Sequence, residues 1–178
     1  MLQIQIKAGE GYNDDTETFT SLPAVSLELE HSLISLSKWE SIHMVPFLGK
    51  DEKSPEDILD YIRCMSIKKV DPEVFDRLKI EDFKKINEYI AAPMTATTFR
   101  KQESKPLAET ITSELIYYWM FALNIPMECE KWHINRLLTL IRVCNIKNTP
   151  PKKTSKAALA RQRSELNEQR RAQYGTAG

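Results

Sequence analysis

The 178-residue sequence has few glycines, few cysteines and no surplus of charge of either sign. Its five glycines offer little material for phosphate-binding loops, and no GxxxxGK[ST], GxGxxG or GxSxG motif occurs. Three widely spaced cysteines (Cys64, Cys129 and Cys144) match neither a disulfide scaffold nor a zinc ligand set, and a reducing cytoplasm suits them. We therefore expect no catalytic residues, no metal site and no cofactor, and we predict that the protein is not an enzyme.

Long hydrophobic runs are missing as well. The longest apolar stretch, residues 115–123, is far shorter than the roughly 20 residues that a membrane-spanning helix needs. The first eleven residues lack the basic and apolar regions of a secretory signal. We expect no membrane partner and no export. The proportions of apolar residues (42%) and charged residues (28%) are those of a folded protein.

The balance of charge conceals an asymmetry along the chain. From Lys147 onward there are eight basic and two acidic residues, a net charge of +6, so the preceding residues carry −6. Such a split indicates a separate interacting arm. We predict one globular α+β domain over residues 1–148 and a basic C-terminal linker and helical arm over residues 149–178, with the break at the paired prolines Pro150 and Pro151.

Hydrophobic periodicity predicts the fold class. Residues 2–8 and 23–31 alternate apolar and polar side chains around turn-forming residues 11–19, which predicts an antiparallel β-unit. Residues 32–42 continue the alternation, and we predict a third strand there that runs into irregular structure, although Trp39 and Ile42 could equally begin a helical turn. Later segments favour helices, so the predicted fold is α+β and predominantly helical, with a small N-terminal β-unit, a helical core and an extended C-terminal helical arm.

Helix-start signals and apolar content predict the helical core. Ser54 followed by Pro55, and Asp71 followed by Pro72, are typical helix starts, and residues 81–92 have helical spacing before Pro93. Residues 94–100 are prone to β-structure. Residues 107–124 should form one long helix that is apolar all round after Leu115, and we expect the core to centre on it.

The helix predicted from Trp132 to Asn148 contains the most reactive residue types. Its apolar face includes His133, together with Leu137, Leu140, Ile141 and Cys144, whereas Asn135, Thr139 and Arg142 form the opposite, polar stripe. The interpretation that we favour is a core histidine, hydrogen-bonded to backbone, because no catalytic partner lies nearby in the sequence. Arg136 follows Trp132 by one turn, a spacing that lets its guanidinium lie over the indole.

The candidate partner-binding residues lie on that helix and in the arm. They are Arg136, Arg142, Lys152, Lys153, Lys156, Leu159, Arg161, Arg163, Leu166, Arg170, Arg171 and Tyr174. Cations in an arm suit nucleic acid or an acidic protein surface. One aromatic residue in the arm and an acidic body disfavour nucleic acid, so we predict a protein partner, with the acidic body of another copy among the candidates. A solvated arm that binds nothing is the remaining alternative.

Seven segments resemble a family of small proteins encoded by tailed bacteriophages. These are SLSKWES, LDYIRCM, INEYI, PMTATTF, ITSELIYYWM, IPMECEKWHINRLLTLIRVCNIKN and RRAQYGTAG. The resemblance implies a role in virion assembly, with other phage tail or virion proteins as partners. The first expectation is a tail assembly chaperone that coats the apolar helices of the tape-measure protein in the host cytoplasm. The alternative is a minor structural component at the baseplate, tail or neck of the virion, whose arm clasps a neighbouring subunit. A nucleic-acid-binding accessory protein is the least favoured.

Overall fold

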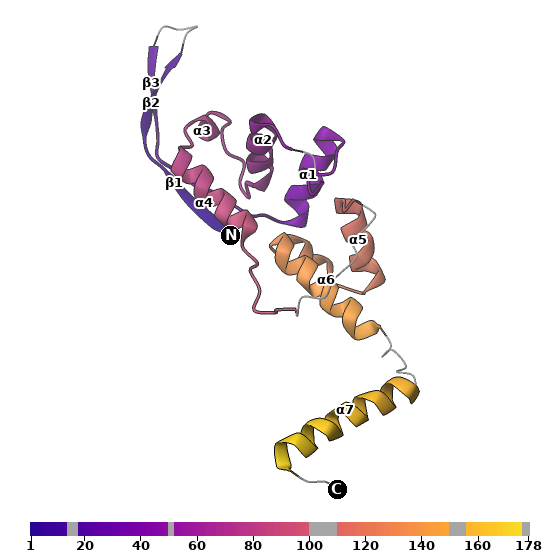
Figure 1. Ribbon diagram of the computed structural model, residues 1–178. Helices are drawn as coiled ribbons and strands as arrows, with labels where there is room; N and C mark the ends of the chain where they lie inside the picture. Colours follow the sequence, from indigo (N-terminus) through magenta and orange to yellow (C-terminus); the bar gives the residue numbers. More distant parts are fainter. Residues whose placement is uncertain (14–17, 50–51, 100–109, 150–155, 176–178) are drawn as a thin grey trace. The chain divides into compact units, whose positions relative to one another are not determined.

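The computed structural model describes residues 1–13, 18–49, 52–99, 110–149 and 156–175 (Figure 1). The chain divides into two compact units, Met1–Asn145 and Ile146–Gly178, and each is described by itself. The division falls within the last helix of the first unit. The predicted class is confirmed, because the chain is α+β and mainly helical.

An antiparallel hairpin forms the N-terminal β-unit. Its strands are β1 (Leu2–Ile6), β2 (Gly9–Asn13), β3 (Thr18–Leu22) and β4 (Val25–Leu29), with β1 paired to β4 and β2 to β3. The pairing of Leu2 with Leu29 and of Gly9 with Leu22 belongs to one register, so both pairs continue a single hairpin. The alternation correctly predicted strands at β1 and β4, but residues 9–13 and 18–22 are strands too, which the sequence analysis missed.

A helix replaces the predicted third strand. Residues 32–42 were expected to extend the β-unit, yet α1 runs over Leu33–His43. Ser32 has extended backbone, and its side chain accepts a hydrogen bond from the backbone N–H of Ser35 at 3.3 Å, which caps the helix. The spacing of apolar residues in this segment fits both the two-residue period of a strand and the 3.6-residue period of a helix. The cap therefore decides between the two.

Three helices follow: α2 (Pro55–Met65), α3 (Glu73–Asp76) and α4 (Ile80–Ala91). The predicted start at Pro55 is confirmed, whereas the second helix starts at Glu73, one residue after the predicted Pro72, and lacks a side-chain cap. Ser54 and Asp57 form a capping box, in which each side chain accepts from the other residue's backbone N–H. Residues 94–99 contain no strand, contrary to their β-prone composition.

The remaining elements of the first unit are α5 (Ser113–Ala122), the 3-10 helix η1 (Met127–Lys131) and α6 (Ile134–Asn148). The helix predicted over residues 107–124 is therefore shorter. Thr112 caps its start, accepting from the backbone N–H of Leu115 at 3.3 Å, and residues 107–109 lie outside the described part of the chain. The predicted break at Pro150 and Pro151 lies outside it as well. In the second unit, α7 covers Lys156–Tyr174.

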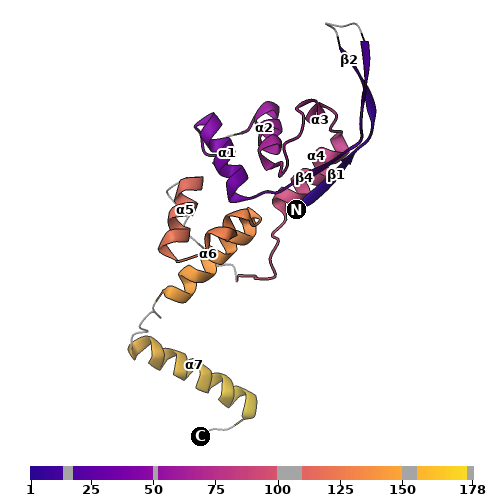
Figure 2. The same cartoon turned by 180° about the vertical axis from the view of Figure 1, so that it is seen from behind.

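The core of the first unit centres on α1 rather than on α5. Leu33, Leu36 and Trp39 of α1 are fully buried. Helix α1 packs against α2 and α5 and touches η1, and Figure 2 shows it from behind with α2 and α5 on either side. The expected core centre was wrong because α5 has neighbours along only part of its circumference.

Candidate protein-binding site

Helix α5 exposes aromatic side chains that sequence analysis expected to be buried. Ile116 and Met120 are fully buried, whereas the side chains of Tyr118 and Phe121 are 64% and 65% exposed. Glu114 lies on the same side of the helix and is also exposed. We call Glu114, Tyr118 and Phe121 the α5 face. Large exposed aromatic residues of this kind are typical of surfaces that bind other proteins.

A buried carboxylate fixes the start of α5. The side chain of Glu40 is only 7% exposed, and its two oxygens accept from the backbone N–H groups of Phe47 at 2.9 Å and Ser113 at 2.7 Å. A carboxylate at a helix N-terminus also opposes the positive end of the helix dipole. Glu40 therefore joins α1, the following loop and α5 into one support for the α5 face.

A second contact holds the middle of α5. The hydroxyl of Tyr117 donates to Glu130 of η1 at 3.0 Å. Burial, and then the hydrogen bond and negative charge of Glu130, raise the pKa of Tyr117 to about 12. The phenol stays protonated and keeps donating at any physiological pH. Because Tyr117 and Tyr118 are neighbours on the helix, this anchor orients Tyr118 outward.

An apolar hollow continues the α5 face beyond Glu114. Its cavity volume is about 260 Å³, and Met44, Val45 and Thr112 are among its lining residues. Met44 is 84% exposed and takes the left-handed backbone conformation (φ 55°) that ends α1, its N–H donating to the carbonyl of Glu40 at 2.8 Å. We call this cavity the α1–α5 hollow.

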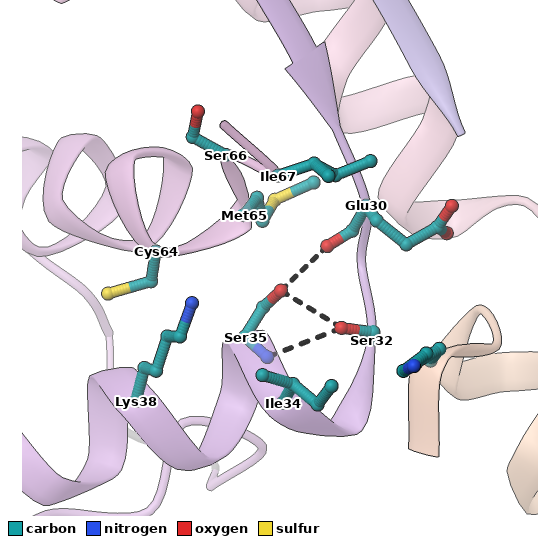
Figure 3. A pocket seen from close by; sticks show the side chains of 10 residues that line it. Glu30, Ser32, Ile34, Ser35, Lys38, Cys64, Met65, Ser66 and Ile67 are labelled. Carbon is teal, nitrogen blue, oxygen red and sulfur yellow. Dashed lines mark hydrogen bonds between the residues drawn. The ribbon is translucent and has the colours of Figure 1, made fainter. Parts of the chain in front are cut away.

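A second, more polar hollow lies beside the start of α1 (Figure 3). It has a volume of about 310 Å³ and is lined by Ser32, Ser35, Lys38 and Cys64, among others. The Ser35 hydroxyl donates to the carbonyl of Glu30 at 2.7 Å, so it is engaged in the fold. Burial raises the pKa of the Cys64 thiol, which keeps it protonated and weakly nucleophilic. The arrangement does not activate a nucleophile.

The two buried histidines form a polar cluster within the core. His31 Nδ1 lies 2.5 Å from the Tyr61 hydroxyl, and the rings of His31 and His133 meet edge to face at 4.9 Å. His133 Nε2 donates to the carbonyl of Tyr89 at 3.0 Å, which confirms the prediction of a core histidine bonded to backbone. Its contact with His31, 102 positions earlier, has no counterpart in the local spacing of residues.

Burial sets the protonation of this cluster. It lowers the pKa of His31 to about 3, with a smaller contribution from His133, and it lowers the pKa of His133 as well. Burial also raises the pKa values of Tyr61 and Tyr89, and the Tyr89 hydroxyl donates to Glu30 at 2.5 Å. At neutral pH every imidazole and phenol here is uncharged and bonded. The cluster braces the junction of β4, α2, α4 and α6.

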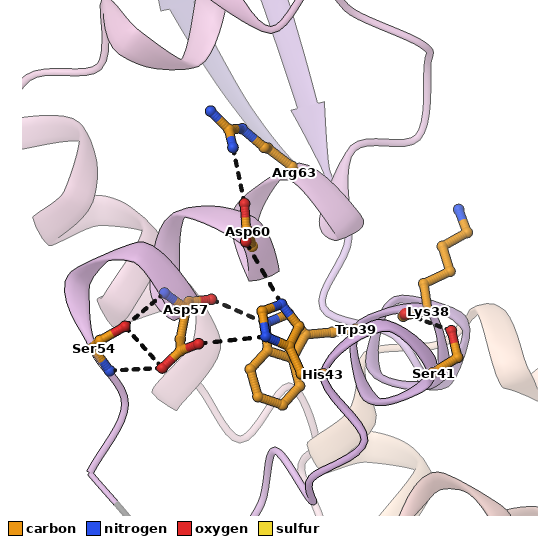
Figure 4. Close-up of polar contacts among 8 residues, drawn as sticks. All are labelled: Lys38, Trp39, Ser41, His43, Ser54, Asp57, Asp60 and Arg63. Carbon is orange, nitrogen blue, oxygen red and sulfur yellow. Dashed lines mark hydrogen bonds and ion pairs between the residues drawn. The ribbon is translucent and has the colours of Figure 1, made fainter.

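His43 makes a different contact, at the surface between α1 and α2 (Figure 4). Its ring stacks on Trp39 with a centroid distance of 4.2 Å, and its nitrogens lie 3.4 Å from Asp57 and 3.6 Å from Asp60. Hydrogen bonds from Ser54 lower the pKa of Asp57, so this carboxylate remains charged. In the described part of the chain, no group of three or more histidine, cysteine or acidic residues has an arrangement that could hold a metal ion. The His43 contact is a brace.

The predicted partner-binding residues of α6 stack on aromatic rings. The guanidinium of Arg136 lies 3.9 Å from the ring centroid of Trp132, and that of Arg142 lies 4.1 Å from Phe99. Asn135 differs from its predicted place in an outer, polar stripe. Its amide donates to the carbonyls of Ile90 and Ala92 at 3.0 and 2.9 Å, so it secures the end of α4.

The arm residues lie on α7 of the second unit. The side chains of Arg161, Arg163, Leu166, Arg170, Arg171 and Tyr174 are all exposed. Lys156 and Leu159 belong to the helix, but their side chains lie outside the described residues, as do Lys152 and Lys153 entirely.

Sequence reasoning missed the α5 face. The signal was present, because Glu114 shares one side of the helix with Tyr118 and Phe121 at spacings of four and seven residues. A charged residue in line with two aromatics is unusual for a side that is deeply buried. The apolar composition of α5 concealed that pattern.

Comparison with known proteins adds no relative. No known family matches the sequence, and neither the curated proteins nor the solved structures contain a match. Across the described ranges, no helix combines the length and the apolar character needed to cross a bilayer.

Proposed function

We propose that the protein acts without catalysis in the assembly of a bacteriophage tail, by binding another tail protein in the host cytoplasm. The observation that carries the proposal is the α5 face, where Tyr118 and Phe121 are each about two-thirds exposed beside the α1–α5 hollow. Exposed aromatics on a firmly anchored helix suit the docking of an apolar helix, since aromatic anchors supply much of the energy of protein interfaces.

The resemblance to small phage proteins supplies the class of partner. A tape-measure protein consists of long apolar helices that need cover until the tail tube encloses them. The α5 face offers an apolar surface with a carboxylate at one end, and Glu40 and Tyr117 hold it in place before any partner arrives. A preformed surface lowers the ordering cost of binding.

Replacement of both aromatics tests this proposal. We expect Y118D/F121D to abolish co-purification of the tape-measure protein when the phage tail genes are co-expressed. The matched control is Ile80→Asp, because Ile80 is 88% exposed at the start of α4, away from the α5 face. Undiminished co-purification with Y118D/F121D would refute this role for α5.

A minor structural role in the virion is the second candidate. The exposed cations of α7 favour it, because a basic helix can clasp an acidic neighbour in a particle. Mass spectrometry of purified particles separates the candidates. A chaperone is absent from particles despite abundant expression, whereas a structural component is present at a fixed copy number. The least favoured role, binding of nucleic acid, requires an affinity that falls steeply with added salt.

A further inference from the structure

The α5 face has a defined spacing of groups. Glu114, Tyr118 and Phe121 fall within an arc of about 60° on the helix, at successive steps of four and three residues. All three side chains are exposed. The α1–α5 hollow adjoins the Glu114 end of this stripe, because Glu114 is one of its lining residues. From the start of α5 onward, the surface therefore presents an apolar hollow, then one carboxylate and then two aromatic rings.

Helix α7 carries a matching series. Arg163, Leu166 and Arg170 follow one another at steps of three and four residues, and Tyr174 lies one turn further on. These four fall within an arc of about 80°, whereas Glu165 and Glu168 point to other sides of the helix. The helix therefore presents one cationic and apolar face, and Leu166 and Tyr174 on it are 45% and 71% exposed.

We propose that α7 of a second copy of this chain binds the α5 face in an antiparallel direction. Reading α5 backward from Phe121 gives steps of three and four residues, the same as those of α7. The register places Arg163 over the ring of Phe121, Leu166 on Tyr118, and Arg170 beside Glu114. These contacts are a cation–π pair, an apolar contact and an ion pair.

The α1–α5 hollow determines the direction. In the antiparallel register Tyr174 lies one turn beyond Arg170, where it meets the hollow next to Glu114. In the parallel direction Tyr174 would pass the other end of α5 and leave the hollow empty. A hollow of about 260 Å³ whose lining includes both apolar Met44 and Val45 and polar Thr112 suits a phenol, whose ring is apolar and whose hydroxyl can stay hydrated.

Charge complementarity points to a second copy as the occupant. Residues before Lys147 carry a net charge of −6 and those from Lys147 onward carry +6, so two copies neutralise each other by exchanging arms. Reciprocal exchange also forms both contacts at once in a closed twofold dimer. The self-association does not need the proposed function. Its consequence, that the arm and a tail protein compete for the α5 face, rests on that function.

The first test is the mass in solution of the full-length protein, by light scattering after size exclusion over a range of concentrations. We expect the mass to rise toward twice that of the 20.6 kDa chain. Arg170→Glu should weaken dimerisation about tenfold or more. The matched control is Arg171→Glu, which changes charge equally at the next residue but lies about 140° from Leu166. The swap E114R/R170E should restore the dimer that either single change weakens.

The second test is complementation between two inactive variants. Phe121→Asp removes the face and Leu166→Asp removes the arm contact, so each should be monomeric alone. Mixed in equal amounts, they should form a dimer through one intact face and one intact arm. Circular dichroism of each variant checks its fold, and the charge swap covers the case in which Leu166→Asp melts α7.

Three outcomes would overturn the proposal. They are a wild-type protein that is monomeric at every concentration, as expected if each arm bound its own body, an Arg171→Glu variant as weakened as Arg170→Glu, and a variant mixture that stays monomeric. Because these measurements contain no tail protein, their failure leaves the proposed function to its own co-purification test.

Discussion

Helices α2 and α5 both pack against α1, yet they use their apolar residues in opposite ways. Helix α2 has mixed composition, and it places Tyr61, Ile62 and Met65 in the core. Helix α5 is apolar over most of its length, but Tyr118 and Phe121 lie in solvent. Burial therefore depends on the neighbours that a helix finds, and apolar residues left without neighbours indicate where another molecule binds.

The largest loss of stability is expected at the contact between α1 and α2. Trp39 is fully buried, its indole N–H donates to the carbonyl of Asp57 at 3.1 Å, and its ring stacks on His43. We expect Trp39→Ala to lower the free energy of unfolding by about 4 kcal/mol, measured by urea denaturation, because it leaves a cavity. Trp39→Phe keeps an aromatic ring and should cost clearly less. Equal losses would mean that packing of the ring contributes little.

Acid should lower the free energy of unfolding through His31, which contacts Tyr61 of α2. The pKa of His31 is near 6.5 in the unfolded chain and about 3 in the fold, so the unfolded chain binds more protons between these values. Stability is therefore full above pH 6.5 and is lost as the pH falls toward 3. At pH 4.5 the loss from His31 is about 3 kcal/mol.

The measurement is the free energy of unfolding against pH. His31→Gln should show a shallower slope than wild type between pH 6.5 and 4.5, with the remaining slope coming from His133, whose pKa burial also lowers. Exchange of the surface histidine, His43→Gln, is the control. An unchanged slope in His31→Gln would contradict the assignment.

Removal of one charge should loosen the link between α1 and α5. In Glu40→Gln the amide nitrogen would face one of the two backbone N–H groups that now donate to the carboxylate. We expect a loss of about 2 kcal/mol in chemical denaturation. Glu114→Gln, on the exposed start of the same helix, should change stability by less than about 0.5 kcal/mol.

The smallest effect on stability is expected at the α5 face itself. At a concentration at which the chain is monomeric, Y118S/F121S should leave the thermal unfolding midpoint almost unchanged, since changes to exposed side chains alter the free energy of unfolding by less than about 0.5 kcal/mol. Ile116→Ser, on the buried side of the same helix, should lower it strongly. A large loss of stability in Y118S/F121S would show that the face is part of the core rather than a binding surface.

Local sequence signals predicted what local chemistry controls. Ser54 and Pro55 start α2 where expected, and His133 is a core residue bonded to a backbone carbonyl. The strand predicted at residues 32–42 was wrong because the Ser32 cap outweighs an alternation that also fits a helix. The site depended on long-range contacts. The bond from Ser113 to Glu40 spans 73 residues, and no spacing in the sequence could announce it.

One residue joins the two halves of the N-terminal hairpin. At the interruption between the strand pairs, the guanidinium of Arg77 donates to the carbonyls of Lys7, which follows β1, and Pro23, which precedes β4. The inner pair, β1 with β4, buries Ile4 and Leu27 in the core. Its amides should exchange with deuterium only when the whole unit unfolds, while those of β2 and β3 open locally. Arg77 thus marks the boundary between the strand pair that should unfold only with the whole unit and the strand pair that should open by itself.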